Sequence, residues 1–258
     1  MTGNLAEGQR TPCDILEWDT SFFGFRVARV RGDVLTKERI QEIDSWCRQA
    51  GVGCLYFLSR VDDPNTTRLA EDNGFRLVDV RITMEYGAPE AIRDAEHQGD
   101  CAVVVRCARP EDVPFLRSIA RESYHDTRFY FDVSFPRQLS DRLYETWITT
   151  SCDGYADAVF VAELEGVVGG YVTCHLDGGA SPGRIGLFGV HSQARGRGIG
   201  HTLVRHALGW FSARGARKAL VVTQGRNCAA QRLYQRCGFL TRNVQLWYHK
   251  WYSQPCEG

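Results

Sequence analysis

The sequence predicts an α/β (α+β) fold in which helices flank a mixed central sheet. The apolar run Leu187–Val190 is typical of the end of a buried strand, and a glycine-rich turn and an amphipathic helix follow it. Further along, a helix with a single apolar stripe ends at Gly238, before a long strand-like segment. Elsewhere, apolar runs of strand length alternate with helical patterns.

The composition indicates one large or two modest globular domains, because the chain has 258 residues and 43% of them are hydrophobic. The net charge of zero gives no indication of a nucleic acid or an anionic membrane as partner. The sequence has no apolar run of about 18 residues and no signal-peptide core. The ten cysteines form no C-x-x-C pair and no zinc-like spacing with histidine. We therefore expect a cytoplasmic protein with reduced thiols and no metal ion.

Residues 13–86 are expected to form a first domain. A helix that Gly51 ends and a helix with Pro64 in its first turn lie between strand-like runs. The expected strands are 25–30, 54–58 and 75–86, and the expected helices cover 40–50 and 64–73. Residues 87–100 contain almost nothing apolar and are expected to be a linker.

Residues 101–252 are expected to form the second domain. Glu165 and Gly166 indicate a hairpin turn between two strands. The expected strands are 102–107, 158–164, 167–176, 184–190, 218–223 and 241–251, and the expected helices begin near 110, 139, 199 and 228. Residues 124–136 combine aromatic and charged side chains without periodicity, which favours a recognition loop.

The basic, glycine-rich turn before the helix at 199 is a candidate anion site. The first N–H groups of a helix have no internal partner, and the helix dipole favours negative charge there. Arg195 and Arg197 add positive charge. A pyrophosphate group would fit. The turn lacks the Gly-Lys-Ser/Thr of a Walker loop, and its glycines do not make a good dinucleotide fingerprint.

Two motifs resemble the GCN5-related N-acetyltransferase (GNAT) superfamily. Gln193, Gly196 and Gly198 match its Q-x-x-G-x-G signature, and Asn227 to Phe239 resemble its N-x-x-A-x-x-L-Y-x-x-x-G-F segment. The resemblance covers about residues 101–250 and implies a GNAT fold with acetyl-CoA, or a longer acyl-CoA, as co-substrate. A glycine-rich turn of some other α/β protein is the alternative.

The resemblance also implies roles for individual residues. Tyr234 would protonate the departing sulfur, and a helix tyrosine that only packs on the last strand is the alternative. The Val190 N–H would polarise the thioester carbonyl, and Asn227 would bind pantetheine. The cofactor-binding residues implied are Phe188, Gly189, Val190, Gln193, Arg195, Gly196, Arg197, Gly198, Ile199, Gly200 and Asn227. The base is not identified, and His125, Asp126 and Glu163 are candidates.

The acceptor is expected to bind at the loop 124–136. The candidate substrate residues there are His125, Asp126, Arg128, Tyr130 and Asp132, and the alternative is that they anchor a surface loop. Trp18 to Phe25 and Asp141 to Ile148 resemble N-acetyltransferases that act on dTDP-linked 4-amino-4,6-dideoxygalactose. The implied function is transfer of an acyl group to the amine of a dTDP-linked amino-deoxy sugar. The alternative acceptors are an aminoglycoside, a polyamine and a peptide N-terminus, and the alternative function is a non-catalytic coenzyme A-binding module. Whether the protein forms a homodimer stays open.

The two halves of the chain share a local pattern. Arg68–Phe75 lines up with Arg232–Phe239, and a long strand is expected after each. We infer that residues 13–86 are a truncated, degenerate GNAT-like half. It lacks the glycine-rich turn, and Ala70 stands in the place of Tyr234, so it should bind no coenzyme A and instead extend the sheet and wall the acceptor pocket. The alternative is that helix, glycine, phenylalanine and strand simply form a common local pattern.

Overall fold

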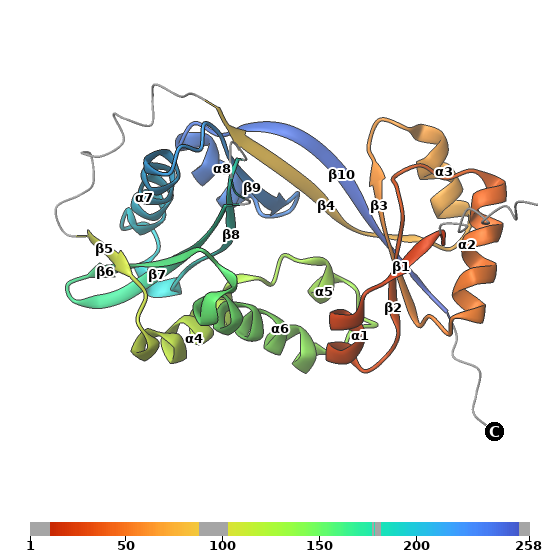
Figure 1. Cartoon of the computed structure of the whole chain (residues 1–258), viewed down its shortest axis with the longest axis horizontal. Helices are drawn as coiled ribbons and strands as arrows, with labels where there is room; N and C mark the ends of the chain where they lie inside the picture. Colours follow the sequence, from red (N-terminus) through yellow and green to blue (C-terminus); the bar gives the residue numbers. More distant parts are fainter. Residues whose placement is uncertain (1–10, 88–102, 177, 179–181, 253–258) are drawn as a thin grey trace, which may run out of the picture. The chain divides into compact units, whose positions relative to one another are not determined.

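A computed structural model describes residues 11–87, 103–176, 178 and 182–252. The chain divides into two compact units, one formed by residues up to Asp79 together with those from Gln245 onward, and the other by Val80–Val244. Figure 1 labels the elements of both units. Most of the expected linker, residues 88–100, lies outside the described residues.

The division falls at other points than the boundaries expected at 86 and 101. Strand β4 (Arg76–Tyr86) and strand β10 (Leu240–Trp251) each run through both units. The second half of β4 pairs antiparallel with β9 (Ala219–Gln224) of the larger unit. Residues 245–251 of β10 pair antiparallel with β3 (Cys54–Arg60) of the smaller unit. Backbone hydrogen bonds thus assign each strand end to the unit that it pairs with.

The smaller unit has a short sheet with a helical crossover. Strand β1 (Cys13–Ile15) pairs antiparallel with β2 (Val27–Val30), and β2 pairs parallel with β3. Helix α1 (Glu17–Phe23) connects β1 to β2, α2 (Lys37–Gln49) connects β2 to β3, and α3 (Pro64–Asp72) precedes β4. Helix α2 buries Ile40, Ile43 and Cys47, which follow the helical period, in the core of this unit.

The larger unit has a six-strand order, β4-β9-β8-β7-β6-β5. Its strands are β5 (Val103–Cys107), β6 (Ala158–Leu164), β7 (Val167–Leu176) and β8 (Gly183–Val190), with β9 and part of β4. Antiparallel pairs join β5 to β6, β6 to β7 and β7 to β8, whereas β8 and β9 are parallel. The sheet is mixed, as the sequence predicts.

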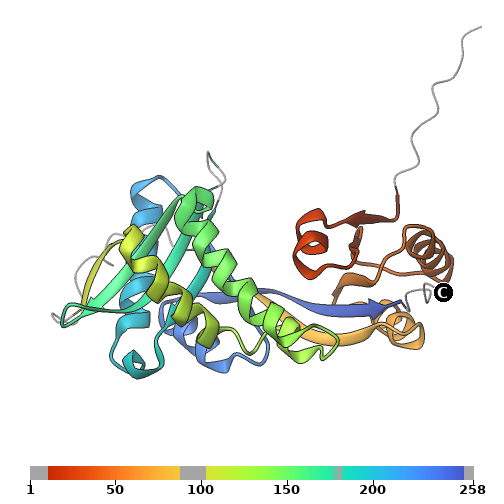
Figure 2. The same cartoon turned by 90° about the horizontal axis from the view of Figure 1, so that it is seen from below.

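Helices cover both faces of this sheet (Figures 1 and 2). Helices α4 (Val113–Ser123) and α6 (Arg137–Thr150) lie on one face, and α7 (Ile199–Ala213) lies on the other, with α8 (Cys228–Arg236) following β9. Helix α7 buries Ile199, Leu203, Ala207 and Phe211, which follow the helical period, in the core. Short turns of helix cover Pro110–Asp112, Ser151–Tyr155 and Ser192–Ala194 (η4).

The predicted helices and strands agree with the structure apart from short elements. The hairpin at 158–176 turns at Glu165 and Gly166, both with positive φ. The sequence indicated no helix within 124–136, but Arg128–Phe131 forms the short helix α5. Four residues are too few to show a helical period.

None of the helices in the described part of the chain has the length and apolarity that a bilayer crossing requires. Over the same residues, the His, Cys, Asp and Glu side chains form no group of three that could hold a metal ion.

Candidate active site

Strands β8 and β9 diverge at the centre of the larger sheet. Their parallel pairing joins Gly183, Arg184 and Ile185 to Ala219, Leu220 and Val221. Strand β8 continues to Val190 and β9 to Gln224, but these later residues do not pair with each other, although both strands are described to their ends. From Gly186 onward, one edge of β8 is therefore open inside the unit.

The backbone groups on this open edge belong to alternate residues. The His191 N–H donates to the Gly169 carbonyl, at 2.9 Å, and so faces β7. Because strand backbones alternate, the peptide groups of Phe188 and Val190 face the opposite way. Contacts agree with this, since the Val190 carbonyl accepts from Arg195 Nε at 3.2 Å and Phe188 bonds to a side chain described below. The backbone groups of Phe188 and Val190 thus lie on the edge along which a ligand could pair like a strand.

The glycine-rich turn lies directly after this edge. Gly196 and Gly198 have φ values of 77° and 81°, and Gly198 is the N-cap of α7. A glycine cap supplies no side-chain acceptor, so the first N–H groups of α7 keep their capacity to bind an anion. A Cβ at either glycine would meet no atom within 4 Å, so the space in front of the turn is open.

Side chains around the turn have distinct roles. Gln193 is exposed on η4. Arg195 contacts the Val190 carbonyl, and Arg197 Nη2 lies 3.0 Å from Glu165 Oε1 in an exposed ion pair. Exposed pairs contribute at most about 1 kcal/mol, so Arg197 can exchange this partner for a phosphate. Ile199 is buried, which anchors the start of α7 in the core.

Glycines bring the turn close to the neighbouring elements. A Cβ at Gly200 would lie 3.2 Å from the Leu233 side chain of α8 and 3.5 Å from that of Phe188. A Cβ at Gly189 would lie only 2.9 Å from side-chain atoms of Ile119 and Tyr171. These two glycines therefore let α7, α8 and α4 pack closely around β8.

Asn227 is the N-cap of α8. Its Oδ1 accepts from the Ala230 N–H at 3.0 Å, which leaves the side-chain amide protons as donors. Gln231 Nε2 donates to the carbonyls of Gln224 and Gly225, both at 2.9 Å, and fixes the end of β9. The sequence did not single out Gln231.

Tyr234 lies on α8 and is buried. Its ring centroid is 6.1 Å from that of Phe188 and 5.7 Å from that of Phe239. Burial raises the pKa of Tyr234 well above its usual value, and the nearby Tyr124 adds to this rise. Among the described residues, its hydroxyl has no hydrogen-bond partner. The hydroxyl is therefore protonated and available as a donor.

Two further tyrosines, which the sequence analysis missed, reach the same edge. Tyr124 follows α4, and its hydroxyl contacts the Tyr171 hydroxyl at 3.1 Å and both backbone groups of Phe188. Tyr124 as a whole keeps some exposure, but its hydroxyl lies inside the unit, and burial raises the pKa of Tyr124 and of Tyr171. No local signal connects Tyr124 to a residue 64 positions later, because only the packing of α4 on β8 brings them together.

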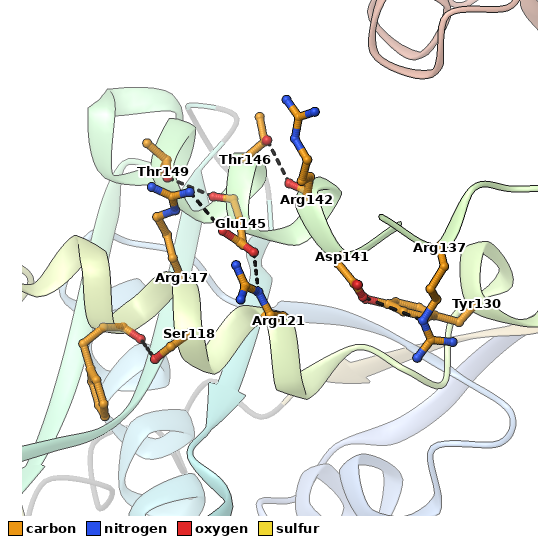
Figure 3. Close-up of polar contacts among 11 residues, drawn as sticks. Arg117, Ser118, Arg121, Tyr130, Arg137, Asp141, Arg142, Glu145, Thr146 and Thr149 are labelled. Atoms are coloured by element: carbon orange, nitrogen blue, oxygen red, sulfur yellow. Dashed lines mark hydrogen bonds and ion pairs between the residues drawn. The ribbon is translucent and has the colours of Figure 1, made fainter. Parts of the chain in front are cut away.

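The predicted acceptor loop is partly ordered by its own side chains (Figure 3). The Tyr130 hydroxyl donates to Asp141 Oδ1 at 2.8 Å, and the guanidinium of Arg137 lies 4.4 Å from the Tyr130 ring centroid. The His125 ring is 4.8 Å from the Tyr130 ring. The structure thus brings His125 and Tyr130 together.

The other three loop candidates differ in their surroundings. Asp126 is partly buried, and Asp132 Oδ1 accepts from the Ser134 N–H at 3.1 Å. The guanidinium of Arg128 lies 4.5 Å from the Phe129 ring centroid.

A buried carboxylate joins the two helices that flank this loop (Figure 3). Glu145 on α6 accepts from Arg117 Nη2 at 2.9 Å and from Arg121 Nε at 2.6 Å, both on α4. Burial opposes the charge of Glu145, but the hydrogen bonds from the two arginines outweigh burial and lower its pKa.

Glu163, one of the base candidates, is held elsewhere in the sheet. It lies on β6 and forms an ion pair at 2.5 Å with Arg106 of β5, and Arg106 also pairs with Asp112 at 2.7 Å. In the strand order, β7 separates β6 from β8. The Arg106 guanidinium therefore already occupies the Glu163 carboxylate.

Similarity to known proteins agrees with this geometry. Residues 116–239 match the model of the acetyltransferase (GNAT) family. These residues form a GNAT domain. The protein is an N-acyltransferase with this domain, and its glycine-rich turn, the open edge of β8 and Tyr234 all lie within the matched residues.

Individual relatives cover more of the chain. The dTDP-fucosamine acetyltransferase of Escherichia coli O6:H1 is 28% identical over 249 residues, which are 93% of this chain and 99% of the relative. The spore coat polysaccharide biosynthesis protein SpsD of Bacillus subtilis is 26% identical over 149 residues, 55% of this chain and 48% of the relative. The crystal structure of a GCN5-related N-acetyltransferase from Sphaerobacter thermophilus superposes with a TM-score of 0.59 at 21% identity, over 93% of this chain and 76% of that one.

Proposed function

We propose that the protein transfers an acetyl group from acetyl-CoA to the amino group of a dTDP-linked amino-deoxy sugar. The observation that carries the acyl-CoA part is the open edge of β8, which leads into the glycine-capped N-terminus of α7. The sugar part rests on the match to dTDP-fucosamine acetyltransferase, which extends over both halves of the chain.

The residues at this site fit acyl-CoA. The pyrophosphate would bind the first N–H groups of α7, with Arg195 and Arg197 as cations. The pantetheine arm would lie on the β8 edge, where Phe188 and Val190 present their amides. Asn227 would donate its free amide protons to the same arm. The open space before Gly196 and Gly198 supports this arrangement.

The chemistry requires two contributions from the chain besides removal of the amine's proton. The thioester supplies an activated acyl group, and an amide of the β8 edge stabilises its oxygen as negative charge develops. The Tyr234 hydroxyl donates a hydrogen bond to the sulfur as it leaves. Because burial raises the pKa of Tyr234, full transfer of its proton to the thiolate is uphill, so the hydroxyl would stabilise the departing sulfur by a hydrogen bond and the thiolate would take its proton from water.

The attacking amine must be neutral, and its proton must leave the site. His125 is exposed and lies 3.4 Å from Arg137, and Asp126 is its neighbour in the loop. Both could receive a proton through water, and we propose this route in preference to Glu163, which Arg106 holds.

We further propose that the smaller unit is a degenerate copy of the GNAT fold. In both halves an antiparallel strand pair precedes a parallel strand pair joined by a helix, and a second helix and a long strand follow. Helices α3 and α8 end alike, because Phe75 and Phe239 each donate to a carbonyl five residues earlier, in Ala70 and Tyr234. The smaller unit would bind no acyl-CoA.

A thiol-release assay with acetyl-CoA tests the proposed function. The acceptors would be dTDP sugars with an amine at C3 or C4, an aminoglycoside, spermidine and a peptide, with the hydroxyl analogue of each sugar as control. We expect release only with a dTDP-amino sugar. Release with another amine would discard the sugar, and silence with every acceptor despite acetyl-CoA binding would favour a longer acyl donor or a non-catalytic module.

A further inference from the structure

The Tyr124 hydroxyl occupies both hydrogen-bonding positions of Phe188 on the open edge of β8. The Phe188 N–H donates to the hydroxyl oxygen at 2.9 Å, and the hydroxyl donates to the Phe188 carbonyl at 3.1 Å. The Tyr171 hydroxyl lies 3.1 Å away. A hydroxyl has one donor and two acceptor sites, so all three contacts form together when Tyr171 donates to Tyr124. The edge at Phe188 is thus satisfied without a ligand.

The same amide is the one that a thioester would reach. The proposed pyrophosphate site follows Val190 in the chain, so a pantetheine arm that runs back along β8 passes Val190 before Phe188. The two amides are separated by two residues, or about 7 Å of strand. Because the thioester is at the far end of the arm, the Phe188 N–H, rather than that of Val190, would meet its carbonyl oxygen.

One N–H cannot serve the tyrosine and the thioester at once. The Tyr124 hydroxyl oxygen stands where a carbonyl oxygen would accept, at the hydrogen-bond distance from Phe188 N. Tyr124 also follows the last residue of α4 and stacks on Tyr144, with ring centroids 4.2 Å apart.

We propose that the Tyr124 hydroxyl is a stand-in acceptor that the thioester carbonyl of acyl-CoA displaces from the Phe188 N–H. This inference rests on the proposed function. Tyr124 is then a positioning residue: it keeps the Phe188 peptide hydrogen-bonded and the edge open until a donor arrives. In the ground state, the hydrogen bond that the thioester carbonyl gains from Phe188 is offset by the one that Tyr124 loses. The bond from Phe188 to the oxyanion is stronger, so the net stabilisation falls on the transition state.

The proposal predicts how tyrosine removal changes ligand preference. Coenzyme A lacks the thioester carbonyl, so it does not compete with the Tyr124 hydroxyl for the Phe188 N–H. In the wild-type protein, acetyl-CoA and coenzyme A should therefore bind with dissociation constants that differ by no more than about threefold. Tyr124→Phe keeps the stacked ring but leaves the Phe188 N–H without its acceptor, so acetyl-CoA should gain about three- to tenfold over coenzyme A.

Isothermal titration of the full-length protein with acetyl-CoA and with coenzyme A measures this ratio, without an acceptor sugar. Tyr171→Phe is the matched control, because it removes the other partner of Tyr124 and keeps both contacts to Phe188. Its ratio should stay within about twofold of the wild-type ratio.

Three results would overturn the inference. One is an unchanged or lowered ratio in Tyr124→Phe, and another is the same rise in both variants. The third concerns the wild-type protein alone and applies even if Tyr124→Phe fails to fold: a preference for acetyl-CoA above about tenfold would mean that the carbonyl displaces nothing. Binding of neither ligand by the wild-type protein would instead contradict the proposed function, and this inference with it.

Discussion

Helices α2 and α7 hold the same place in their units, but their N-termini differ. Each connects two parallel strands, β2 to β3 and β8 to β9. At α2, the Thr36 hydroxyl accepts from the Arg39 N–H at 3.2 Å, and Glu38 lies in the first turn. At α7, the cap is Gly198, and the first turn contains no acidic residue.

This difference shows how one topology yields either a helix that caps its own N-terminus or one whose first N–H groups have no side-chain cap. The backbone N–H and the Thr36 hydroxyl lower the pKa of Glu38, so its carboxylate stays charged at the positive end of α2. The chain itself thereby satisfies the N-terminus of α2. The N-terminus of α7 keeps its donors for a ligand, and the parallel strand before it keeps an open edge.

The largest expected effect is at the N-terminus of α7. Gly198→Glu should weaken acyl-CoA binding by at least about 100-fold, because a side chain at φ 81° is strained and its carboxylate takes the place of the pyrophosphate. Equilibrium dialysis with acetyl-CoA measures the loss. Such a carboxylate would give α7 the type of N-terminus that α2 already has.

Gly198→Gln separates charge from strain, because it has the same shape and backbone cost but no charge. It should bind acetyl-CoA at least about tenfold more tightly than Gly198→Glu does. Equal losses in the two variants would mean that the turn does not recognise an anion by charge.

The two units also differ near the ends of α8 and α3, where Tyr234 and Ala70 occupy matching positions. Tyr234→Phe should lower kcat by about 100-fold, because the leaving sulfur loses its hydrogen-bond donor. The dissociation constant of acetyl-CoA should change by less than about threefold, because the buried ring remains. Stopped-flow thiol release and titration measure the two quantities separately.

Tyr86→Phe is the matched control for Tyr234→Phe, because Tyr86 is also buried and its ring lies 5.6 Å from that of Phe239. Its rate should stay near that of the wild type. The pH profile of the wild-type rate gives a further check. Because burial raises the pKa of Tyr234, its hydroxyl stays protonated. The rate should therefore rise with pH as the amine is deprotonated, without a fall before about pH 10. An unchanged rate in Tyr234→Phe would remove Tyr234 as the donor.

Local sequence signals predicted the helix ends and turns, whereas tertiary packing determined the contact at Phe188 and the unit boundaries. The glycines at 74 and 238 adopt positive φ after α3 and α8, and Glu165 with Gly166 makes the hairpin turn, as their residue types indicate. The contact of Tyr124 with Phe188 was not predictable, because it depends on how α4 lies on β8. The domain boundaries also depended on strand pairing, which assigns the ends of β4 and β10 to different units.

The smallest expected effect is at the N-terminus of α2. Thr36→Ala removes the hydroxyl that caps α2, so the free energy of unfolding should fall by about 1 kcal/mol. Urea denaturation measures this loss, and acetyl-CoA binding should not change, because Thr36 belongs to a helix that already satisfies its own N-terminus.

Thr202→Ala is the counterpart in the first turns of α7. The Thr202 hydroxyl donates back to the Gly198 carbonyl at 3.3 Å and caps no N–H, so its removal should leave the free energy of unfolding within about 0.5 kcal/mol of the wild type. If both threonine variants lost the same stability, the hydroxyl of Thr36 would have no special role at α2. The contrast between the N-termini of α2 and α7 would then have to rest on Gly198 and on Glu38.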